Sequence, residues 1–283
     1  MLKIAIQKSG RLQEGSLKLL KECGLGILNG KNQLKAKTTN FPAEILFLRD
    51  DDIPEYVQDG VADIGIVGEN VWLEKKGNTD IVHKLDFAKC RMSLAVPKST
   101  EFTGLSWFEG KRIATSYPNI INKFLKENNI SADTHQISGS VEIAPSIGLA
   151  EAIFDIVSTG STLLSNGLKE VHTVLESEAV LIGNNNLSEE KQELLSQLIF
   201  RIKAVQDAKN NKYIILNAPN EAIEKITSVI PGMNSPTITP LKNSGWSAMH
   251  SVVNENDFWN KIDQLKSLGA QGILVIPIEK MIN

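Results

Sequence analysis

Residues 152–164, with the sequence AIFDIVSTGSTLL, combine an apolar run, a turn of hydroxyl side chains around one glycine, and the start of a helix. From Leu2 to about Gly183, short apolar runs alternate with segments of helical spacing in the same way. This alternation is typical of an α/β fold whose sheets contain mostly parallel strands. The stretch therefore predicts one strand–loop–helix unit of such a fold.

The loop in this stretch has the composition of a phosphate site. Gly160 allows a tight turn, so that successive backbone N–H groups point into one concavity, and a following helix adds partial positive charge. Asp155, just upstream, can accept hydrogen bonds from ribose hydroxyls. Together they indicate a ribose 5-phosphate site, with further donors from the hydroxyls of Ser158, Thr159, Ser161 and Thr162. An ordinary loop with a Ser or Thr helix cap explains the same residues, and the pattern leaves both interpretations open.

Flanking segments extend the α/β pattern into two similar sets. The first set comprises strands at residues 2–6, 44–49 and 62–67, and the second comprises strands at 90–96, 111–116 and 152–157 with a helix at 118–128. Two lobes of the same kind follow from this arrangement. Whether residues 179–184 return the chain to the first lobe is left open by the pattern alone.

The C-terminal segment has the clearest element order. From about Lys212 the pattern predicts strand, helix, two strands, helix and a last strand, which is the βαββαβ plan of a ferredoxin-like domain. Such a domain attached to an α/β enzyme often binds a small regulatory ligand in a pair of copies. A purely structural dimerisation module is the alternative.

Composition excludes several classes of protein. The 283 residues suggest about two domains. The formal net charge of -3 lacks the basic excess that binding to a nucleic-acid backbone requires, so no nucleic-acid partner is expected. No apolar run is long enough for a membrane span, and the first residues do not resemble a secretory signal, so we expect no membrane association and a cytoplasmic protein. The 2 cysteines form no CxxC pair that would indicate zinc or a disulfide framework.

Cations also fall at predicted strand ends. Lys8, Gly10 and Arg11 follow the first strand, and Arg49 ends another. Open α/β sheets bind anions outside the carboxyl ends of their strands, although a single Lys or Arg there is more often a solvated surface cation. The acids at positions 50–52 are expected to end in a helix cap at Asp52 rather than to bind a metal directly, because adjacent acids cannot all reach one ion without strain.

Two further acids stand at similar positions. Glu69 follows the strand at residues 62–67, and Glu142 lies in GSVEIAP. Each either faces a ligand or belongs to the first turn of a helix. The 4 histidines show no metal-binding spacing, so metalloenzyme and Ser-His-Asp interpretations have no support.

These motifs together resemble the long form of ATP phosphoribosyltransferase, the first enzyme of histidine biosynthesis. The resemblance rests on IAIQKSGRL, LRDDDIPEYVQDGVADIGIVGEN, KRIATSYP, GSVEIAP, DIVSTGSTLLSNGL, SPTITPL, AMHSV and GILVIPIEKM, and covers nearly the whole chain. It implies a two-lobed catalytic core like a periplasmic binding protein, with lobe I at residues 1–90 and 178–210 and lobe II at 91–177. It also implies a ferredoxin-like regulatory domain at 211–283 and a homo-oligomer, from dimer to an inhibited homohexamer.

The resemblance further implies a reaction and its residues. N1 of ATP would join C1 of phosphoribosyl pyrophosphate, with Mg²⁺ held mainly by the pyrophosphate and no protein ligand of the metal assigned. Asp155, Lys8 and Arg49 would be catalytic. The substrates would contact Gly10, Arg11, Glu69, Glu142, Asp155 and the loop Ser158, Thr159, Gly160, Ser161 and Thr162, where Ser161 replaces an alanine common in relatives. Histidine would bind as an inhibitor at Asn217 and Thr237.

Two other functions are compatible with parts of the sequence. A two-lobed solute-binding protein without catalysis would share the core, but it would normally carry an export signal. A stand-alone amino-acid sensor would use only the C-terminal domain and leave the hydroxyl-rich loop unexplained. Product formation from ATP, phosphoribosyl pyrophosphate and Mg²⁺ would distinguish the enzyme from both.

Overall fold

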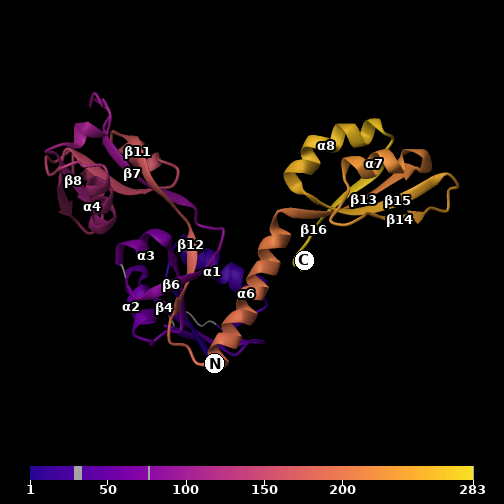
Figure 1. The fold of residues 1–283 in the computed structure, drawn as a ribbon, viewed down its shortest axis with the longest axis horizontal. Helices are drawn as coiled ribbons and strands as arrows, with labels where there is room; N and C mark the ends of the chain where they lie inside the picture. Colours follow the sequence, from indigo (N-terminus) through magenta and orange to yellow (C-terminus); the bar gives the residue numbers. More distant parts are fainter. Residues whose placement is uncertain (29–33, 76, 283) are drawn as a thin grey trace. The chain divides into compact units, whose positions relative to one another are not determined.

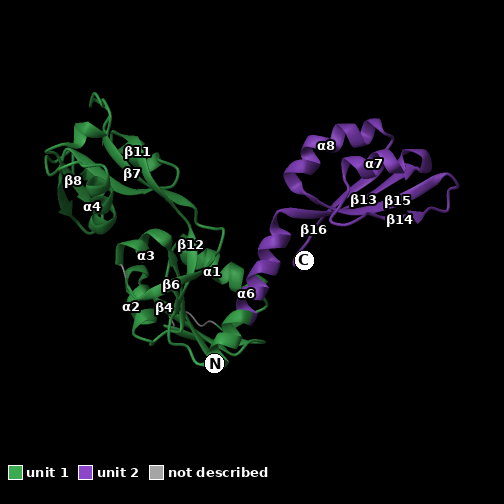
Figure 2. Cartoon of the chain, in the orientation of Figure 1, with its two compact units in different colours: residues 1–196 green, residues 197–283 purple. Residues whose placement is uncertain are grey.

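A computed structural model describes residues 1–28, 34–75 and 77–282. The chain divides into two compact units, residues 1–196 and 197–283 (Figure 2). No helix among the described residues is both long enough and apolar enough to cross a bilayer.

Lobe I of the first unit is built on a seven-stranded sheet with a parallel centre. Its strand order is β2-β3-β4-β1-β5-β12-β6. The strands are β1 (Leu2–Gln7), β2 (Gly26–Leu28), β3 (Lys35–Thr39), β4 (Ala43–Leu48), β5 (Ile64–Gly68), β6 (Thr79–Lys84) and β12 (Ala179–Asn184). β1 pairs in parallel with β4 and β5, whereas β12 runs antiparallel to β5 and β6. The chain thus returns to this sheet through β12.

The helices of lobe I pack closely on that sheet. They are α1 (Arg11–Glu22), the short turn η1 (Asp50–Asp52), α2 (Ile53–Gln58) and α3 (Glu69–Lys75). A Cβ added at Gly65 of β5 would lie 2.5 Å from Ile53 of α2, so this glycine allows the helix to approach the sheet. Buried apolar residues on β1, β4 and β5 fill the core beneath.

Lobe II has a five-stranded sheet of order β11-β7-β10-β8-β9. The strands are β7 (Cys90–Pro97), β8 (Arg112–Thr115), β9 (Asp133–Gln136), β10 (Ala152–Val157) and β11 (Leu168–Ser177). The helices are η2 (Leu105–Phe108), α4 (Pro118–Glu127), η3 (Val141–Ile143) and α5 (Ser161–Ser165). β10 pairs in parallel with β8 but antiparallel with β7.

Both sheets are therefore mixed, and the expectation of mostly parallel strands was wrong. Periodicity identifies a strand but carries no information on direction, and the antiparallel pairs arise from edge hairpins and from the strands that cross between lobes. The predicted two-lobed α/β architecture itself is confirmed.

The second unit has the predicted βαββαβ order. Its four-stranded sheet has the strand order β14-β15-β13-β16. The strands are β13 (Asn211–Pro219), β14 (Thr237–Pro240), β15 (Trp246–Asn254) and β16 (Gln271–Pro277). The short turn η4 (Asn220–Ala222) precedes α7 (Ile223–Val229), which lies with α8 (Glu255–Ser267) on one face of the sheet (Figure 1). Ile214, Leu216 and Met249 point toward these helices and are fully buried. Within residues 197–282, α7 and α8 leave the opposite face of the sheet uncovered.

Helix α6 (Glu189–Lys209) contains the boundary between the units, which falls after Ser196. The end of the helix belongs to the second unit, where Met281 N donates to the Ala204 carbonyl at 2.9 Å. The compact unit therefore begins earlier than the domain boundary expected at residue 211.

Candidate active site

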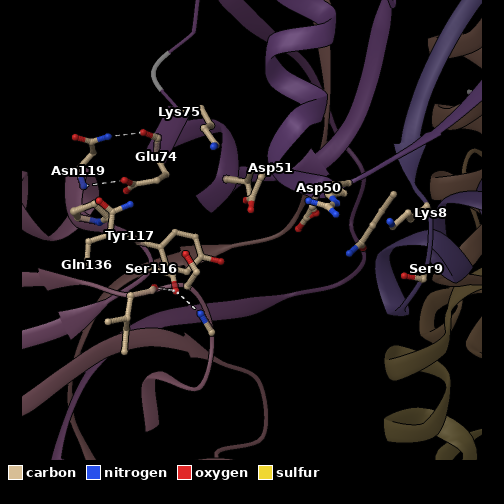
Figure 3. Close-up of a pocket in the computed structure, with 17 residues that line it drawn as sticks. Lys8, Ser9, Asp50, Asp51, Glu74, Lys75, Ser116, Tyr117, Asn119 and Gln136 are labelled. Carbon is tan, nitrogen blue, oxygen red and sulfur yellow. Dashed lines mark hydrogen bonds between the residues drawn. The ribbon is translucent and has the colours of Figure 1, made fainter. Parts of the chain in front are cut away.

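A cavity of about 780 Å³ lies between the two lobes of the first unit (Figure 3). From lobe I it is lined by residues after β1 and β4, including Lys8, Arg49, Asp50 and Asp51. From lobe II it is lined by Tyr117 and neighbouring residues that follow β8, and by residues 136–139. Loops at the carboxyl ends of parallel strands thus meet at one site, as expected for an open α/β sheet.

Two of the three predicted catalytic residues line this cavity. Lys8 follows β1 and Arg49 follows β4, which are paired strands, so the fold places both cations at one sheet edge. Both side chains are exposed. Such an edge favours an anionic ligand.

Asp50 is the unusual acid of the cavity. Its Oδ1 is buried and has no hydrogen-bond partner among the described residues. Burial raises the pKa of Asp50, and the nearby charge of Asp51 raises it further. The prediction that Asp52 caps the next helix was wrong: residues 50–52 form η1, which continues directly into α2, and Asp52 makes no capping hydrogen bond.

Tyr117 faces these acids from lobe II. Burial raises the pKa of its hydroxyl, and the charges of Asp155, Asp50 and Asp51 raise it further, so the phenol stays neutral at physiological pH. These interactions place Asp155 in the electrostatic environment of the cavity, although it is not among the lining residues. No role was predicted for Tyr117, although it lies in the KRIATSYP motif; its position before a proline at a strand end was the available signal.

Asp155 ends up in a poorly solvated position near the end of β10. Burial raises its pKa to about 6, a backbone hydrogen bond from Ile156 N at 2.7 Å opposes the shift, and the charge of Glu142 adds to it. The structure thus brings Asp155 and Glu142 into electrostatic contact. A carboxyl group whose pKa burial raises to about 6, close to a cavity, is a candidate functional group.

The hydroxyl-rich loop follows Asp155 directly and begins α5. Gly160 has φ 78°, a left-handed conformation that favours glycine, and it precedes the helix. Thr159 Oγ1 and Ser161 Oγ are 3.0 Å apart, while Ser158 and Thr162 are exposed. The loop is accessible to solvent but lies outside the set of residues that line the cavity.

The remaining predicted contacts in the first unit are dispersed. Gly10 (φ 90°) precedes α1, and Arg11 is its exposed first residue. Glu69 begins α3 and accepts a hydrogen bond from Lys84 Nζ at 3.1 Å. None of these three residues lines the cavity, and their roles stay predictions.

Glu74 is a lining residue that the sequence analysis missed. Its side chain reaches from α3 to the start of α4, where its carboxylate accepts from Asn119 N at 2.9 Å (Figure 3). The same carboxylate also accepts from Ile120 N at 3.0 Å. The partners lie 45 and 46 positions away in the sequence. No local sequence pattern predicts a contact between residues so far apart in the sequence.

In the second unit, Asn217 and Thr237 share the sheet face that points away from α7 and α8. Asn217 pairs with Ala248, and Thr237 pairs with His250, two residues further along β15. Residues two apart on a strand share a face. On the same face, Tyr213 Oη and His250 Nδ1 form a hydrogen bond of 2.9 Å.

Comparison with known proteins identifies the family. The family model described as ATP phosphoribosyltransferase matches residues 49–204, more than half of the chain, and the model described as HisG, C-terminal domain matches residues 208–280.

Relatives match along the full length. The ATP phosphoribosyltransferase of Phocaeicola vulgatus is 57% identical over 282 residues, which covers 100% of both chains. That of Cytophaga hutchinsonii is 59% identical over 282 residues, covering 100% of this chain and 99% of the relative.

Solved structures match 72–73% of this chain. A chain of the ATP phosphoribosyl transferase (HisG:HisZ) complex from Thermotoga maritima is 30% identical with a TM-score of 0.60, and the match covers 72% of this chain and 99% of that one. A histidine kinase sensor domain similar to periplasmic binding proteins, 10% identical with a TM-score of 0.51 over 73% of this chain and 90% of that one, shows the two-lobed fold alone. Since the full-length identities and both family models agree, the chain belongs to the ATP phosphoribosyltransferase family, with the C-terminal domain of the long form.

Proposed function

We propose that the chain transfers the phosphoribosyl group of phosphoribosyl pyrophosphate to N1 of ATP, releasing pyrophosphate in the first step of histidine biosynthesis. The observation that carries this proposal is the match of 57–59% identity along the full chain to proteins of that name. The cavity between the lobes supports it, because cations from β1 and β4 face polar groups from lobe II. We place the reaction in the cytoplasm.

Catalysis in this proposal is mainly positioning. ATP is itself the nucleophile, so no covalent intermediate with the protein is required. Lys8 and Arg49 neutralise phosphates of the two substrates where their side chains line the cavity. Holding two reactants in line can lower the barrier by up to ~7–11 kcal/mol.

Asp155 supplies negative charge beside the ribose. Positive charge develops at C1 as the bond to pyrophosphate breaks, and an ionised carboxylate that accepts from ribose hydroxyls stabilises it. With a pKa of about 6, Asp155 is mostly ionised at neutral pH. The loop Ser158–Thr162 then holds the 5-phosphate, with Glu142, Glu69, Gly10 and Arg11 around the substrates.

Mg²⁺ fits this site as a substrate-bound ion. Among the described residues there is no group of three or more His, Cys, Asp or Glu side chains that would hold a metal alone. Mg²⁺ commonly uses one or two carboxylates together with phosphates and water. The partnerless, buried Oδ1 of Asp50, next to Asp51, provides that kind of donor. When bound, Mg²⁺ neutralises charge on the leaving pyrophosphate.

The second unit is proposed to regulate the enzyme. Histidine binds the sheet face that carries Asn217 and Thr237, between copies of the chain, and favours an inhibited homohexamer over smaller oligomers. Support comes from the position of the two polar residues on one face of the sheet, opposite the buried side chains that pack against α7 and α8.

The activity is tested by mixing purified protein with ATP, phosphoribosyl pyrophosphate and Mg²⁺ and following absorbance and pyrophosphate release. The expected result is formation of phosphoribosyl-ATP, which requires all three components. A two-lobed solute-binding protein would bind a ligand without turnover. Saturable binding of either substrate with no product would therefore overturn the enzymatic proposal.

A further inference from the structure

Arg91 connects the loop that follows Asp155 to the edge of the lobe II sheet. Its Nε and Nη2 each donate to a Glu170 carboxylate oxygen at 2.6 Å. Its Nη1 donates to the Ser158 carbonyl at 3.2 Å. Arg91 is the second residue of β7 and pairs with Val157 of β10, while Glu170 lies on β11, so one guanidinium spans three neighbouring strands.

Glu170 is itself held in place. Ser93 Oγ donates to Glu170 Oε1 at 2.8 Å, and Thr173 Oγ1 donates to the same oxygen at 3.2 Å. The side chains of Arg91 and Glu170 are only 31% and 25% exposed. A bidentate Arg–carboxylate pair in this setting has one preferred geometry. The guanidinium is therefore a fixed donor beside Ser158.

A fixed Ser158 carbonyl fixes the next N–H as well. The peptide bond between Ser158 and Thr159 is trans and planar, so its C=O and N–H point in opposite directions. With the carbonyl held toward Arg91, the Thr159 N–H points away from Arg91. If this peptide unit rotated, its carbonyl oxygen would take the place of the N–H group and would repel an anion bound there.

We propose that Arg91, anchored by Glu170, is a positioning residue that holds the Ser158–Thr159 peptide in the orientation that binds the 5-phosphate of phosphoribosyl pyrophosphate. The inference rests on the proposed function, which assigns the phosphate to residues 158–162. Arg91 acts through the peptide and makes no contact with substrate.

Direct phosphate binding by Arg91 predicts the opposite result for one variant. Glu170→Gln removes the negative partner and leaves the guanidinium with uncompensated charge. If Arg91 bound phosphate itself, this change would tighten binding of the anion. If Arg91 positions the loop, the change loosens the guanidinium and weakens binding.

The same lobe contains a matched control at the other end of β10. Arg112 Nη2 donates to Glu151 Oε1 at 2.6 Å, and Arg112 Nε donates to Glu151 Oε2 at 3.3 Å. This pair joins the start of β8 to the residue before β10, away from the loop. Arg112→Met and Glu151→Gln thus break a similar ion pair without touching Ser158.

The experiment measures KM for both substrates, kcat, calorimetric binding of phosphoribosyl pyrophosphate, and the thermal midpoint for the full-length variants. Arg91→Met should raise KM for phosphoribosyl pyrophosphate about tenfold, as expected for loss of one charged hydrogen bond, and change KM for ATP less than about twofold. Arg91→Lys, which keeps a donor, should fall between Met and wild type. Arg112→Met should change neither KM more than about twofold, because its ion pair lies at the other end of β10 from the loop.

The outcomes separate the two proposals. A wild-type protein that forms no product sinks the proposed function. If wild type turns over but Arg91→Met and Arg112→Met shift KM equally, the positioning role is overturned. Tighter binding of phosphoribosyl pyrophosphate by Glu170→Gln also overturns it. If Arg91→Met does not fold, Arg91→Lys and Glu170→Gln are compared with the control Glu151→Gln instead.

Discussion

Burial and the proposed chemistry favour opposite protonation states of Asp155. Burial favours the protonated form and raises its pKa from 3.8 to about 6 in the folded protein. The proposed reaction needs the ionised form beside C1. The native state therefore binds the Asp155 proton more tightly than the unfolded chain does, and this favourable contribution is complete below the unfolded pKa and lost as pH rises through about 6.

We predict that Asp155→Asn loses most of its activity but is more stable at neutral pH. The amide keeps the acceptor for Ile156 N and removes the buried charge, so the free energy of unfolding at pH 7 should rise by about 1–2 kcal/mol, with little change near pH 4. The value of kcat/KM should fall at least about a hundredfold, as expected for losing a charge that stabilises the transition state. Denaturation at both pH values and steady-state kinetics measure this.

Asp133→Asn is the control, since Asp133 is exposed at the start of β9 in the same lobe. It should change neither quantity. Near-normal turnover by Asp155→Asn, or lower stability than wild type at pH 7, would contradict the role given to Asp155.

Some single residues could be identified from sequence and others could not. Lys8 and Arg49 were predicted because each ends a recognisable strand, and the structure places both in the cavity. Asp50 was set aside because an acidic run resembles a helix cap, whereas its unpartnered oxygen is visible only in three dimensions. Arg91 escaped notice because its partner Glu170 lies 79 positions away.

At the scale of elements, helix α4 depends on a neighbour for its N-terminal cap. Its own N-cap residue, Tyr117, makes no side-chain capping bond. Glu74 of α3 supplies the missing acceptor from lobe I with its 8% exposed side chain. A carboxylate near a helix N-terminus satisfies free N–H groups and also interacts favourably with the helix dipole.

We predict that Glu74→Ala lowers the free energy of unfolding by about 2 kcal/mol, because two backbone donors lose a charged acceptor in a buried position. Glu109→Ala is the matched control: Glu109 also accepts from a backbone N–H, that of Ser131 at 3.0 Å, but in an exposed position. Its loss should cost less than about 1 kcal/mol. Chemical denaturation compares the two, and equal losses would show that Glu74 acts as an ordinary surface acid.

Elements with strong periodicity were predicted well, and weakly patterned ones were not. The βαββαβ order of the second unit was predicted because its apolar alternation and glycine stops are regular. β11 was missed, because its sequence LKEVHTVLES contains two register irregularities against β7 that disrupt the alternation. Because β11 was not predicted, the pairing of Arg91 with Glu170 of β11 was not predicted either.

For the whole molecule, regulation requires that a ligand in the second unit prefer one global state. A coupling free energy of ~1–3 kcal/mol corresponds to inhibition of roughly five- to 150-fold. Histidine has two charged ends and an imidazole, which suit the polar groups of Asn217 and Thr237. In the proposed regulation, communication between the units has to pass through a change of assembly or conformation that bound histidine would favour.

We predict that histidine inhibits the full-length enzyme without competing with either substrate, and that Thr237→Ala weakens this inhibition about fivefold or more by removing one hydrogen bond. Inhibition curves, each normalised to its own uninhibited rate, measure the change, with sedimentation showing a shift toward the larger oligomer. Thr227→Ala on α7 is the control. Competitive inhibition that Thr237→Ala leaves intact would locate histidine in the first unit.

Lobe II enters and leaves lobe I at adjacent points. Cys90 at the start of β7 pairs with Ser177 at the end of β11, so the segment between them begins and ends at one place on the five-stranded sheet. A segment with neighbouring ends can be inserted into a host without stretching it. Lobe II thus has the geometry of an exchangeable insert. A short linker could replace it in lobe I, or its two ends could be joined to make a circular chain. Recombination between relatives could exchange lobe II as a whole, and the loop after Asp155 would then move together with the Arg91–Glu170 pair that supports it.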